Sequence, residues 1–375
     1  MIEYLKICNF TETKAGGTPS TKVKEYWENG DIPWLNSGAL NQGIVKTTSK
    51  YITKLGLDNS STKLMPPDTI LIALTGATTG ITGYLTFEAC ANQSVVGILP
   101  SKRHFPKYLY YYLILIRQKV LKDASGAAQP GVNQKYVKNI QIPIPPIDEQ
   151  KRIVAKLDEC FEAIDKARAN VEKNLNNAKE LFQSQLNQSF SQRGEVWVDK
   201  KLGEVCENLD SRRIPITKNK RVSGDIPYYG ASGIVDYVAD FIFDEDLLLV
   251  SEDGANLLAR VYPIAFSISG KTWINNHAHV LKFEEFVSQS FMEYYLNSIK
   301  LDDYVSGMAQ PKLNQKMLNS IPVPYPSLKT QSETVTQLDA LREQTQSLES
   351  NYQQELNALD ELKKSILQKA FNGEL

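Results

Sequence analysis

The sequence has few of the residues from which metal and disulfide sites are built. It contains three histidines and four cysteines in 375 residues. The cysteines, at positions 8, 90, 160 and 206, form no Cys-x-x-Cys pair, which argues against a zinc ribbon and against a disulfide framework. His277 and His279 have no third ligand close to them in sequence, so we expect a polar pair on a sheet surface and no metal site.

Motifs for nucleotide chemistry are also lacking. Gly76-Ala-Thr-Thr-Gly80 is not followed by the lysine of a phosphate loop, and neither Gly-x-Gly-x-x-Gly nor Asn-Pro-Pro-Tyr occurs. A nuclease triad of Asp68, Glu149 and Lys151 can be imagined. However, the segment around Glu149 is repeated 181 residues later in the chain, and there Thr330 takes the place of Glu149. Acidic residues at a helix start explain them better. We therefore expect a chain that is not an enzyme and needs no metal or cofactor of its own.

Long hydrophobic runs are missing as well. No stretch approaches the ~18 apolar residues of a membrane span, and Met1 to Phe10 lack the basic start and apolar run of a signal peptide. Hydrophobic residues make up 42% and charged residues 23% of the chain, as in globular proteins. We expect a cytoplasmic protein with reduced thiols that makes no contact with a membrane.

A large excess of either charge is absent, although the charge is unevenly distributed. The net charge is −1. Residues 1–145 carry 16 basic and 9 acidic groups, which gives +7, whereas residues 196–325 carry 13 and 17, which gives −4. If the chain binds nucleic acid, it must therefore use local patches or the help of a basic partner.

What the sequence does contain is an internal repeat. Ser125-Gly-Ala-Ala-Gln-Pro-Gly-Val-Asn-Gln-Lys135 matches Ser306-Gly-Met-Ala-Gln-Pro-Lys-Leu-Asn-Gln-Lys316 at eight of eleven positions, 181 residues later. The same offset then continues without a gap for about 65 positions. Because this period is too long for a solenoid, we infer a duplicated two-part unit.

The first part of each copy is related more loosely. Gly30-Asp-Ile-Pro-Trp34 resembles Gly224-Asp-Ile-Pro-Tyr228, and Thr75-Gly-Ala77 resembles Asp253-Gly-Ala255, with offsets between 178 and 195. Apolar runs at 69–74 and 247–250 predict strands, and Tyr-rich segments at 103–122 and 283–300 predict helices. Similar framing with loops of different length predicts one fold that carries two different surfaces.

The second part of each copy predicts a long helix. No glycine or proline occurs between Pro146 and Gly194, or between Pro326 and Gly373. Mostly apolar residues recur every 3.5 positions on average. In one copy the series runs from Ile153 to Leu181 and includes the polar Asn174. In the other copy the spacing runs from Thr334 through Leu348, Glu355 and Leu362. This spacing is typical of a coiled-coil seam, with Asn174 and Glu355 as polar positions that set the register. The alternative is that each helix folds back on its own domain.

The predicted fold is of the α+β class, with a pseudo-twofold repeat. Two globular mixed α/β domains, residues 1–145 and 196–326, are joined by two long helices, residues 146–195 and 327–375, that form an antiparallel coiled coil.

The globular domains offer polar and basic loops. Arg, Asn, Gln, Ser and Thr read base edges, and Lys and Arg neutralise phosphates. The candidate DNA-binding residues are Thr18, Ser20, Lys22, Lys24, Ser37, Thr75, Thr78, Thr79, Gln93, Lys135, Arg212, Arg213, Lys218, Lys220, Arg221, Tyr229, Ser232, Arg260, Lys271, Asn275, Lys312 and Lys316.

The duplicated motif resembles that of a known family. Ser-Gly-x-x-Gln-x-x-(Val/Leu)-Asn-Gln-Lys, followed by the Pro-rich step into Asp148-Glu-Gln-Lys-Arg-Ile-Val-Ala-Lys-Leu-Asp158, resembles the specificity subunits of type I restriction-modification systems. Gly16-Gly-Thr-Pro-Ser20 and Trp197 with Leu202-Gly-Glu-Val205 are similar to the openings of their target recognition domains. The resemblance covers essentially the whole chain, and the start of the second helix departs from it, keeping only Gln331.

The resemblance implies a non-catalytic protein that recognises double-stranded DNA. Each domain would read one half of a bipartite, asymmetric site, and the helical rod would set the spacer. Two methylation subunits would bind the helices around Gln150, Arg152, Lys156 and Gln331 and would supply the S-adenosylmethionine site. Restriction subunits would join the full complex. The alternatives are a coiled-coil scaffold whose heads do not bind DNA and part of a stand-alone restriction-methylation enzyme.

Overall fold

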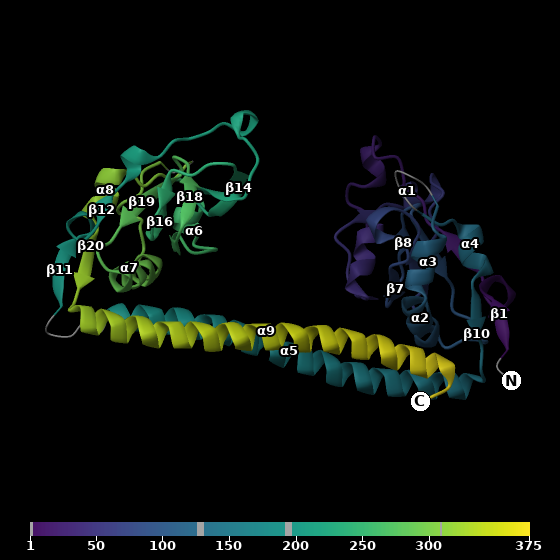
Figure 1. The fold of residues 1–375 in the computed structure, drawn as a ribbon. Coiled ribbons are helices and arrows are strands. Elements are labelled where there is room, and N and C mark those ends of the chain that lie inside the picture. Colours follow the sequence, from purple (N-terminus) through teal and green to yellow (C-terminus); the bar gives the residue numbers. More distant parts are fainter. Residues whose placement is uncertain (1–2, 126–130, 192–196, 308–309) are drawn as a thin grey trace. The chain divides into compact units, whose positions relative to one another are not determined.

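The computed structural model describes residues 3–125, 131–191, 197–307 and 310–375 (Figure 1). The predicted cap Gly194 and residues 126–130 of the first motif therefore lie outside the described residues. The chain divides into two compact units, residues 1–171 with 355–375 and residues 172–354. Each unit thus combines one globular domain with segments of both long helices.

The first unit contains a five-stranded sheet beside two smaller sheets. The five-stranded sheet has the order β2 (Thr13–Ala15), β9 (Val95–Ile98), β6 (Ile70–Ala73), β7 (Thr82–Leu85) and β4 (Ile44–Val45). A three-stranded sheet has the order β5 (Tyr51–Ile52), β3 (Ile32–Leu35) and β8 (Cys90–Ala91). A two-stranded sheet pairs β1 (Tyr4–Lys6) with β10 (Gln141–Pro143). The helices are α1 (Lys54–Asp58), α2 (Pro106–Leu115), α3 (Arg117–Asp123) and α4 (Gln134–Asn139).

The second unit repeats this plan with changed details. One sheet has the order β12 (Glu207–Asn208), β19 (Ala278–Lys282), β16 (Leu247–Ser251) and β17 (Ala265–Ile268). A second has the order β14 (Gly233–Val238), β13 (Ile226–Gly230), β18 (Lys271–Ile274) and β15 (Phe243–Asp244), and β11 (Val198–Lys201) pairs with β20 (Pro322–Tyr325). The helices are α6 (Asn256–Ala259), α7 (Phe286–Ser298) and α8 (Gln315–Ser320).

Strand pairing shows that the two globular domains share one frame. In the first, β3 and β8 are parallel, with Trp34 opposite Cys90. In the second, β13 and β18 are parallel, with Tyr228 opposite Trp273. The predicted strands at 69–74 and 247–250 are confirmed as β6 and β16, whose residues are all buried. The predicted helix at 103–122 is two helices, because the chain leaves helical geometry at Ile116.

The two long helices are confirmed. Helices α5 (Ile147–Ser191) and α9 (Leu328–Asn372) have 45 residues each, and their bounds differ by the repeat offset of 181. In the first unit they run antiparallel, since Asp165 contacts Lys363 and Arg168 contacts Asp360. In the second unit, Arg342 of α9 packs over the ring of Phe182 of α5. The predicted cap Gly373 ends α9 in a left-handed conformation, with φ of 79°.

The predicted seam was wrong in part. Its residues Leu181, Leu348 and Leu362 are 51%, 39% and 46% exposed, and Asn174 and Glu355 are also exposed, so these two polar residues do not set a register. Other seam residues, such as Ile164, Val171 and Ala178, are buried as predicted, and Leu186 and Leu356 are buried outside the predicted seam. An α-helix has 3.6 residues per turn, so a strict heptad ladder drifts off the contact face by about 20° per heptad.

Each hydrophobic core includes side chains from the helix that ends there. Leu367, Ala370 and Phe371 of α9 join the core of the first unit. Leu186 and Phe190 of α5, which correspond to Leu367 and Phe371 at the 181 offset, join the core of the second. Across the described ranges, no helix has the length and hydropathy needed to cross a bilayer.

Candidate nucleic-acid interface

A turn held by an asparagine side chain frames the same edge of both globular domains. In the first, the Asn92 amide donates to the Leu35 carbonyl at 2.8 Å, and the Asn92 Oδ1 accepts from the Ser94 amide at 3.2 Å. In the second, the Asn275 amide donates to the Tyr229 carbonyl at 3.0 Å, and its Oδ1 accepts from the His277 amide at 2.7 Å. The two turns therefore correspond residue by residue.

Each turn presents one member of a hydrogen-bonded side-chain pair. In the first domain, the Thr75 Oγ1 donates to the Ser94 Oγ at 3.0 Å. In the second, the His277 Nδ1 lies 2.7 Å from the Asp253 Oδ2. Thr75 follows β6, and Asp253 follows the equivalent strand β16. A hydroxyl pair in one domain is thus replaced by an imidazole–carboxylate pair in the other.

The repeated motif packs against these pairs. Isolated bridges join Thr75 to Gly131 and Asp253 to Lys312. Further bridges close the motif loop in each copy, from Ser125 to Gly131 and from Ser306 to Lys312. The same backbone bridges therefore form in both copies, although the bridged residues differ: Thr75 and Gly131 in one copy, Asp253 and Lys312 in the other.

Four predicted residues of the first domain meet at this edge. The hydroxyl of Thr18 donates to the Gln93 Oε1, next in sequence to Ser94, and the hydroxyl of Thr78 donates to the Thr75 carbonyl at 3.2 Å. Thr18, Thr75 and Gln93 are exposed. A hollow of about 450 Å³ beside Thr18 is also lined by Lys24, Lys50 and the rings of Trp27 and Trp34. The Glu28 carboxylate also lines it, 4.0 Å from the Lys24 ammonium, and the hydroxyl, amide and remaining ammonium groups suit contacts with base edges and phosphates.

The equivalent region of the second domain contains a buried charge network. The Arg213 guanidinium contacts Glu252 at 2.7 Å and Asp210 at 3.5 Å, and Lys312 contacts Glu252 at 3.1 Å. Burial opposes ionisation of Asp210, yet the hydrogen bonds from His279 and the Val280 amide hold its pKa below the ordinary value. Burial likewise opposes ionisation of Glu252, and bonds from Arg213 and Lys312 lower its pKa.

The expectation of a histidine pair on a sheet surface was wrong. His279 lies in β19 and is 1% exposed, whereas His277 precedes the strand and is exposed. His279, Asp210 and Glu252 place their ligand atoms within 4.8 Å of one another, a spacing that a metal ion could occupy. The His279 Nδ1 already contacts the Asp210 Oδ2 at 2.6 Å, and its Nε2 contacts the Leu313 carbonyl at 2.7 Å. With Arg213 also present, the cluster satisfies its charges internally.

Four predicted arginines are engaged inside the second domain. Besides Arg213, Arg212 pairs with Glu245 at 2.9 Å and Arg221 pairs with Asp236 at 2.9 Å. Arg260 donates to the carbonyls of Leu296 and Ile299, at 3.3 and 2.6 Å. Surface arginines were expected because sequence shows a charge but not its partner. These four side chains support the fold, although that of Arg212 is still 47% exposed, and Lys218 and Lys220 are exposed basic residues.

Two further candidates are buried. Thr79 is 1% exposed and donates to the Gly76 carbonyl at 2.8 Å, and Asn275 is 7% exposed and holds the turn described above. Both act through the backbone and do not present their side chains to a ligand. The remaining candidates are partly or fully exposed and lie at separate places on the two domains: Ser20, Lys22, Ser37, Lys135, Tyr229, Ser232, Lys271 and Lys316.

Two of the four predicted partner-binding residues are also buried. Gln150 and Gln331 are 0% exposed. Gln150 accepts from the Phe105 amide at 2.8 Å and donates to the carbonyls of Arg103 and Pro145. Their side chains therefore cannot reach a partner, and the prediction for them was wrong. The side chains of Arg152 and Lys156 are 51% and 55% exposed, beside Glu149 and Glu159.

Residue patterns did not reveal an exposed apolar segment at the end of α6 and in the turn that follows it. Leu258, Val261 and Tyr262 are 45%, 81% and 46% exposed. The buried Asn256 holds this turn, because its Oδ1 accepts from the amides of Val261 and Tyr262. The Asp253–His277 pair was missed as well, although the repeat alignment of Thr75 with Asp253 was a signal for it.

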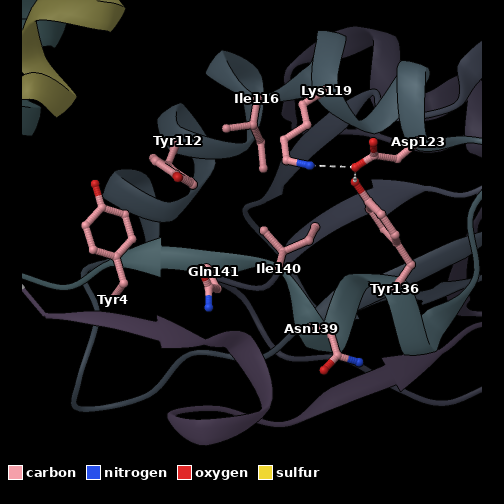
Figure 2. A pocket seen from close by; sticks show the side chains of 9 residues that line it. All are labelled: Tyr4, Tyr112, Ile116, Lys119, Asp123, Tyr136, Asn139, Ile140 and Gln141. Carbon is pink, nitrogen blue, oxygen red and sulfur yellow. Dashed lines mark hydrogen bonds and ion pairs between the residues drawn. The ribbon is translucent and has the colours of Figure 1, made fainter.

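A hollow of about 350 Å³ in the first unit shows how polar groups there are used (Figure 2). Its walls include Tyr112, Lys119, Asp123 and Tyr136. The Asp123 carboxylate accepts from Lys119 at 2.7 Å and from the Tyr136 hydroxyl at 2.8 Å (Figure 2). Burial and the bond to Asp123 raise the pKa of Tyr136 to about 12. These groups neutralise one another, so this hollow is not arranged for acid–base chemistry at neutral pH.

Comparison with known proteins assigns the repeated frame to a family. A family model described as the type I restriction modification DNA specificity domain matches residues 2–174 and again residues 194–358. The chain belongs to this family. Its two matches correspond to the two copies of the internal repeat, and we call the globular parts, residues 3–145 and 197–326, recognition domains 1 and 2.

Relatives match over part or nearly all of the chain. A putative type I restriction enzyme specificity subunit of Haemophilus influenzae is 39% identical over 142 residues, which is 38% of this chain and 36% of that protein. The chain thus spans about a third of that relative's length. The type I restriction enzyme EcoprrI specificity subunit of Escherichia coli is 26% identical over 365 residues, covering 92% of this chain and 89% of that protein.

Solved structures show the same fold. A chain from a study of complex assembly in a type I restriction-modification system matches with a TM-score of 0.81 and 19% identity, covering 100% of this chain and 98% of that one. The HsdS subunit from Thermoanaerobacter tengcongensis matches with a TM-score of 0.60 and 18% identity, covering 100% and 97%. The duplicated α+β architecture with two long helices is therefore that of the specificity subunits.

Proposed function

We propose that this specificity subunit reads a bipartite, asymmetric DNA site, with one half-site for each recognition domain. The observation that carries the proposal is the duplicated edge. Its frame, built by Asn92 and Asn275, is the same in both domains, whereas the side chains mounted on it differ. Because the backbone frame is the same, each domain can present its side chains to DNA in the same way. Because those side chains differ, the two domains select different base sequences.

The long helices suit the role of spacer and docking element. We propose that their length sets the distance between the half-sites and that their surface binds two methylation subunits, with restriction subunits joining the larger assembly. The exposed cations Arg152 and Lys156 near the start of α5 support this role. Gln150 and Gln331 are left out of the contact surface because they are buried.

The chemistry would belong to the partners. We propose that this chain is not itself catalytic and that the methylation subunits carry the S-adenosylmethionine site, act on a base extruded from the duplex and add positive charge around the DNA. The internal pairing of Arg212, Arg213 and Arg221 supports this dependence on a partner, as does the excess of acidic groups in residues 196–325, 17 against 13 basic ones. We expect the assembly to work in the cytoplasm.

The experiment is a map of methylated bases in the host genome, with and without this gene. A split motif, methylated in both halves, should disappear on deletion and return when the gene is restored. If the map does not change while the methylation subunit is expressed, the proposal is refuted, and a scaffold whose domains do not bind DNA explains the chain better.

A further inference from the structure

We propose that Thr75–Ser94 in recognition domain 1 and Asp253–His277 in recognition domain 2 are equivalent base-reading pairs that help to give the two half-sites their different sequences. This inference rests on the proposed function and adds to it the residues that discriminate. It follows from the correspondence of the two pairs on the duplicated frame.

The correspondence is established by the backbone. Ser94 and His277 each follow the framing asparagine by two residues, and each donates its amide to that asparagine's Oδ1. Thr75 and Asp253 each follow the central strand of their sheet, and each bridges to the last residue of the motif loop, Gly131 or Lys312. The four residues therefore occupy two equivalent positions, and each pair joins one position to the other.

The exposure of the pairs suits contact with a ligand. Thr75 is exposed, and the side chains of His277 and Asp253 are 52% and 33% exposed. The bond within this pair uses the His277 Nδ1 and the Asp253 Oδ2. The other two atoms, His277 Nε2 and Asp253 Oδ1, have no hydrogen-bond partner within the described parts of the chain. Each pair is thus held in place by one bond and keeps further polar atoms for a second molecule.

The chemistry of the pairs predicts different preferences. A carboxylate accepts a hydrogen bond from the cytosine amino group, and an imidazole N–H can donate to the guanine N7 or O6. Asp253 with His277 therefore suits a G·C pair. Hydroxyls donate and accept, so Thr75 with Ser94 tolerates several bases and takes its selectivity from neighbours such as Gln93 and Thr18.

Charge explains why the second pair can exist where it does. Lys312 takes the position of Gly131 and pairs with Glu252, the residue before Asp253. Arg213 contacts the same Glu252 at 2.7 Å. These cations offset the extra carboxylates of recognition domain 2 at its DNA-facing edge, where unbalanced negative charge would repel phosphates.

The test exchanges the pairs between the domains. Asp253→Thr with His277→Ser should change the base preference in one half-site only, and Thr75→Asp with Ser94→His should change the other half-site only. Each exchange installs side chains that the sister domain already carries on the same backbone, so folding should be preserved. Glu284→Thr removes an exposed carboxylate elsewhere in recognition domain 2 and should leave the motif unchanged.

The readout is the genomic methylation motif, together with binding of the purified complex with its methylation subunit to site variants. For the Asp253/His277 exchange, discrimination at the affected base pair should fall by roughly ten- to a hundred-fold, and the spacer and the other half-site should be unchanged. An exchange variant that assembles normally and keeps the parent motif overturns the pair assignment but leaves the proposed function standing. A parent protein that yields no split motif overturns the proposed function itself.

Discussion

Gln150 and Gln331, 181 residues apart, make the same hydrogen bonds at the start of the two long helices. Each donates its side-chain amide to the carbonyl of the proline five residues earlier, Pro145 at 2.8 Å and Pro326 at 2.9 Å. Each also accepts a hydrogen bond from its own globular domain, from the Phe105 amide or the Ser288 hydroxyl. The glutamines thus fix the angle at which each domain joins its long helix.

We therefore predict that Gln150→Ala and Gln331→Ala each destabilise the chain. Removing a buried amide leaves carbonyl and donor groups unpaired, which costs about 1–3 kcal/mol. Urea unfolding of the purified chain, followed by tryptophan fluorescence, measures the loss. Lys151→Ala, at the exposed neighbouring position, is the control and should leave the transition in place. An unchanged transition for both glutamine variants would show that the turns do not depend on these bonds.

The helix ends should be as important as the domain interiors. The Phe371 ring lies 5.0 Å from the Tyr108 ring, and the Phe190 ring lies 5.2 Å from the Phe291 ring. We expect Phe371→Ala and Phe190→Ala each to lower the free energy of unfolding by about 3–5 kcal/mol, because each opens a cavity in a core.

Matched controls lie on the same helices. Leu362→Ala and Leu181→Ala alter exposed leucines that also correspond at the 181 offset, and they should change the free energy of unfolding by no more than about 0.5 kcal/mol. Equal effects of the phenylalanine and leucine variants would contradict the packing described for the two cores.

His104 should make the first unit sensitive to mild acid. It is 2% exposed, its Nε2 has no hydrogen-bond partner in the described residues, and burial lowers its pKa to about 4. The unfolded chain binds a proton near pH 6.5, but the folded chain does not until about pH 4. Stability should therefore fall as the pH drops through this window, by up to about 3 kcal/mol. Unfolding measured from pH 7 to pH 4 should show a smaller loss in His104→Asn than in the parent, because only the carboxylates then contribute, and identical pH profiles would refute the prediction.

Charge reversal at Arg152 and Lys156 should weaken assembly with the methylation subunit. Both side chains are exposed near the start of α5, where a partner can reach them. We expect Arg152→Glu with Lys156→Glu to reduce the amount of methylation subunit that copurifies with the chain. Lys166→Glu with Lys173→Glu makes the same change of charge farther along the helix and serves as the control. Copurification at the parent level would remove these residues from the contact surface.

Much of the architecture could be predicted because the repeat appears directly in the residues. The gapless offset predicted two equal helices, and the absence of glycine and proline predicted their length. The seam was harder to predict, since Leu181 and Leu362 satisfy a heptad pattern and yet face outward. A pattern records spacing, whereas the contact face depends on how far each helix drifts along its partner.

The candidate site divides in the same way. Thr18, Thr75, Thr78 and Gln93 were predicted from their polar chemistry and lie together at one edge. Arg213, Asn275 and Gln150 were predicted on the same grounds, and the structure places them among partners of their own. Residue type alone does not distinguish a side chain that offers its hydrogen bonds from one that has already used them.

By itself the sequence determined the duplication, the pair of long helices and the family, because these are written in local spacing and in residues repeated along the chain. Only the tertiary structure decided which polar groups are exposed and which position of one domain corresponds to which position of the other. Thr75 and Ser94 are nineteen residues apart, and Asp253 and His277 are twenty-four apart. They become equivalent pairs because strand pairing brings distant segments together, and hydrogen bonding and burial depend on that proximity.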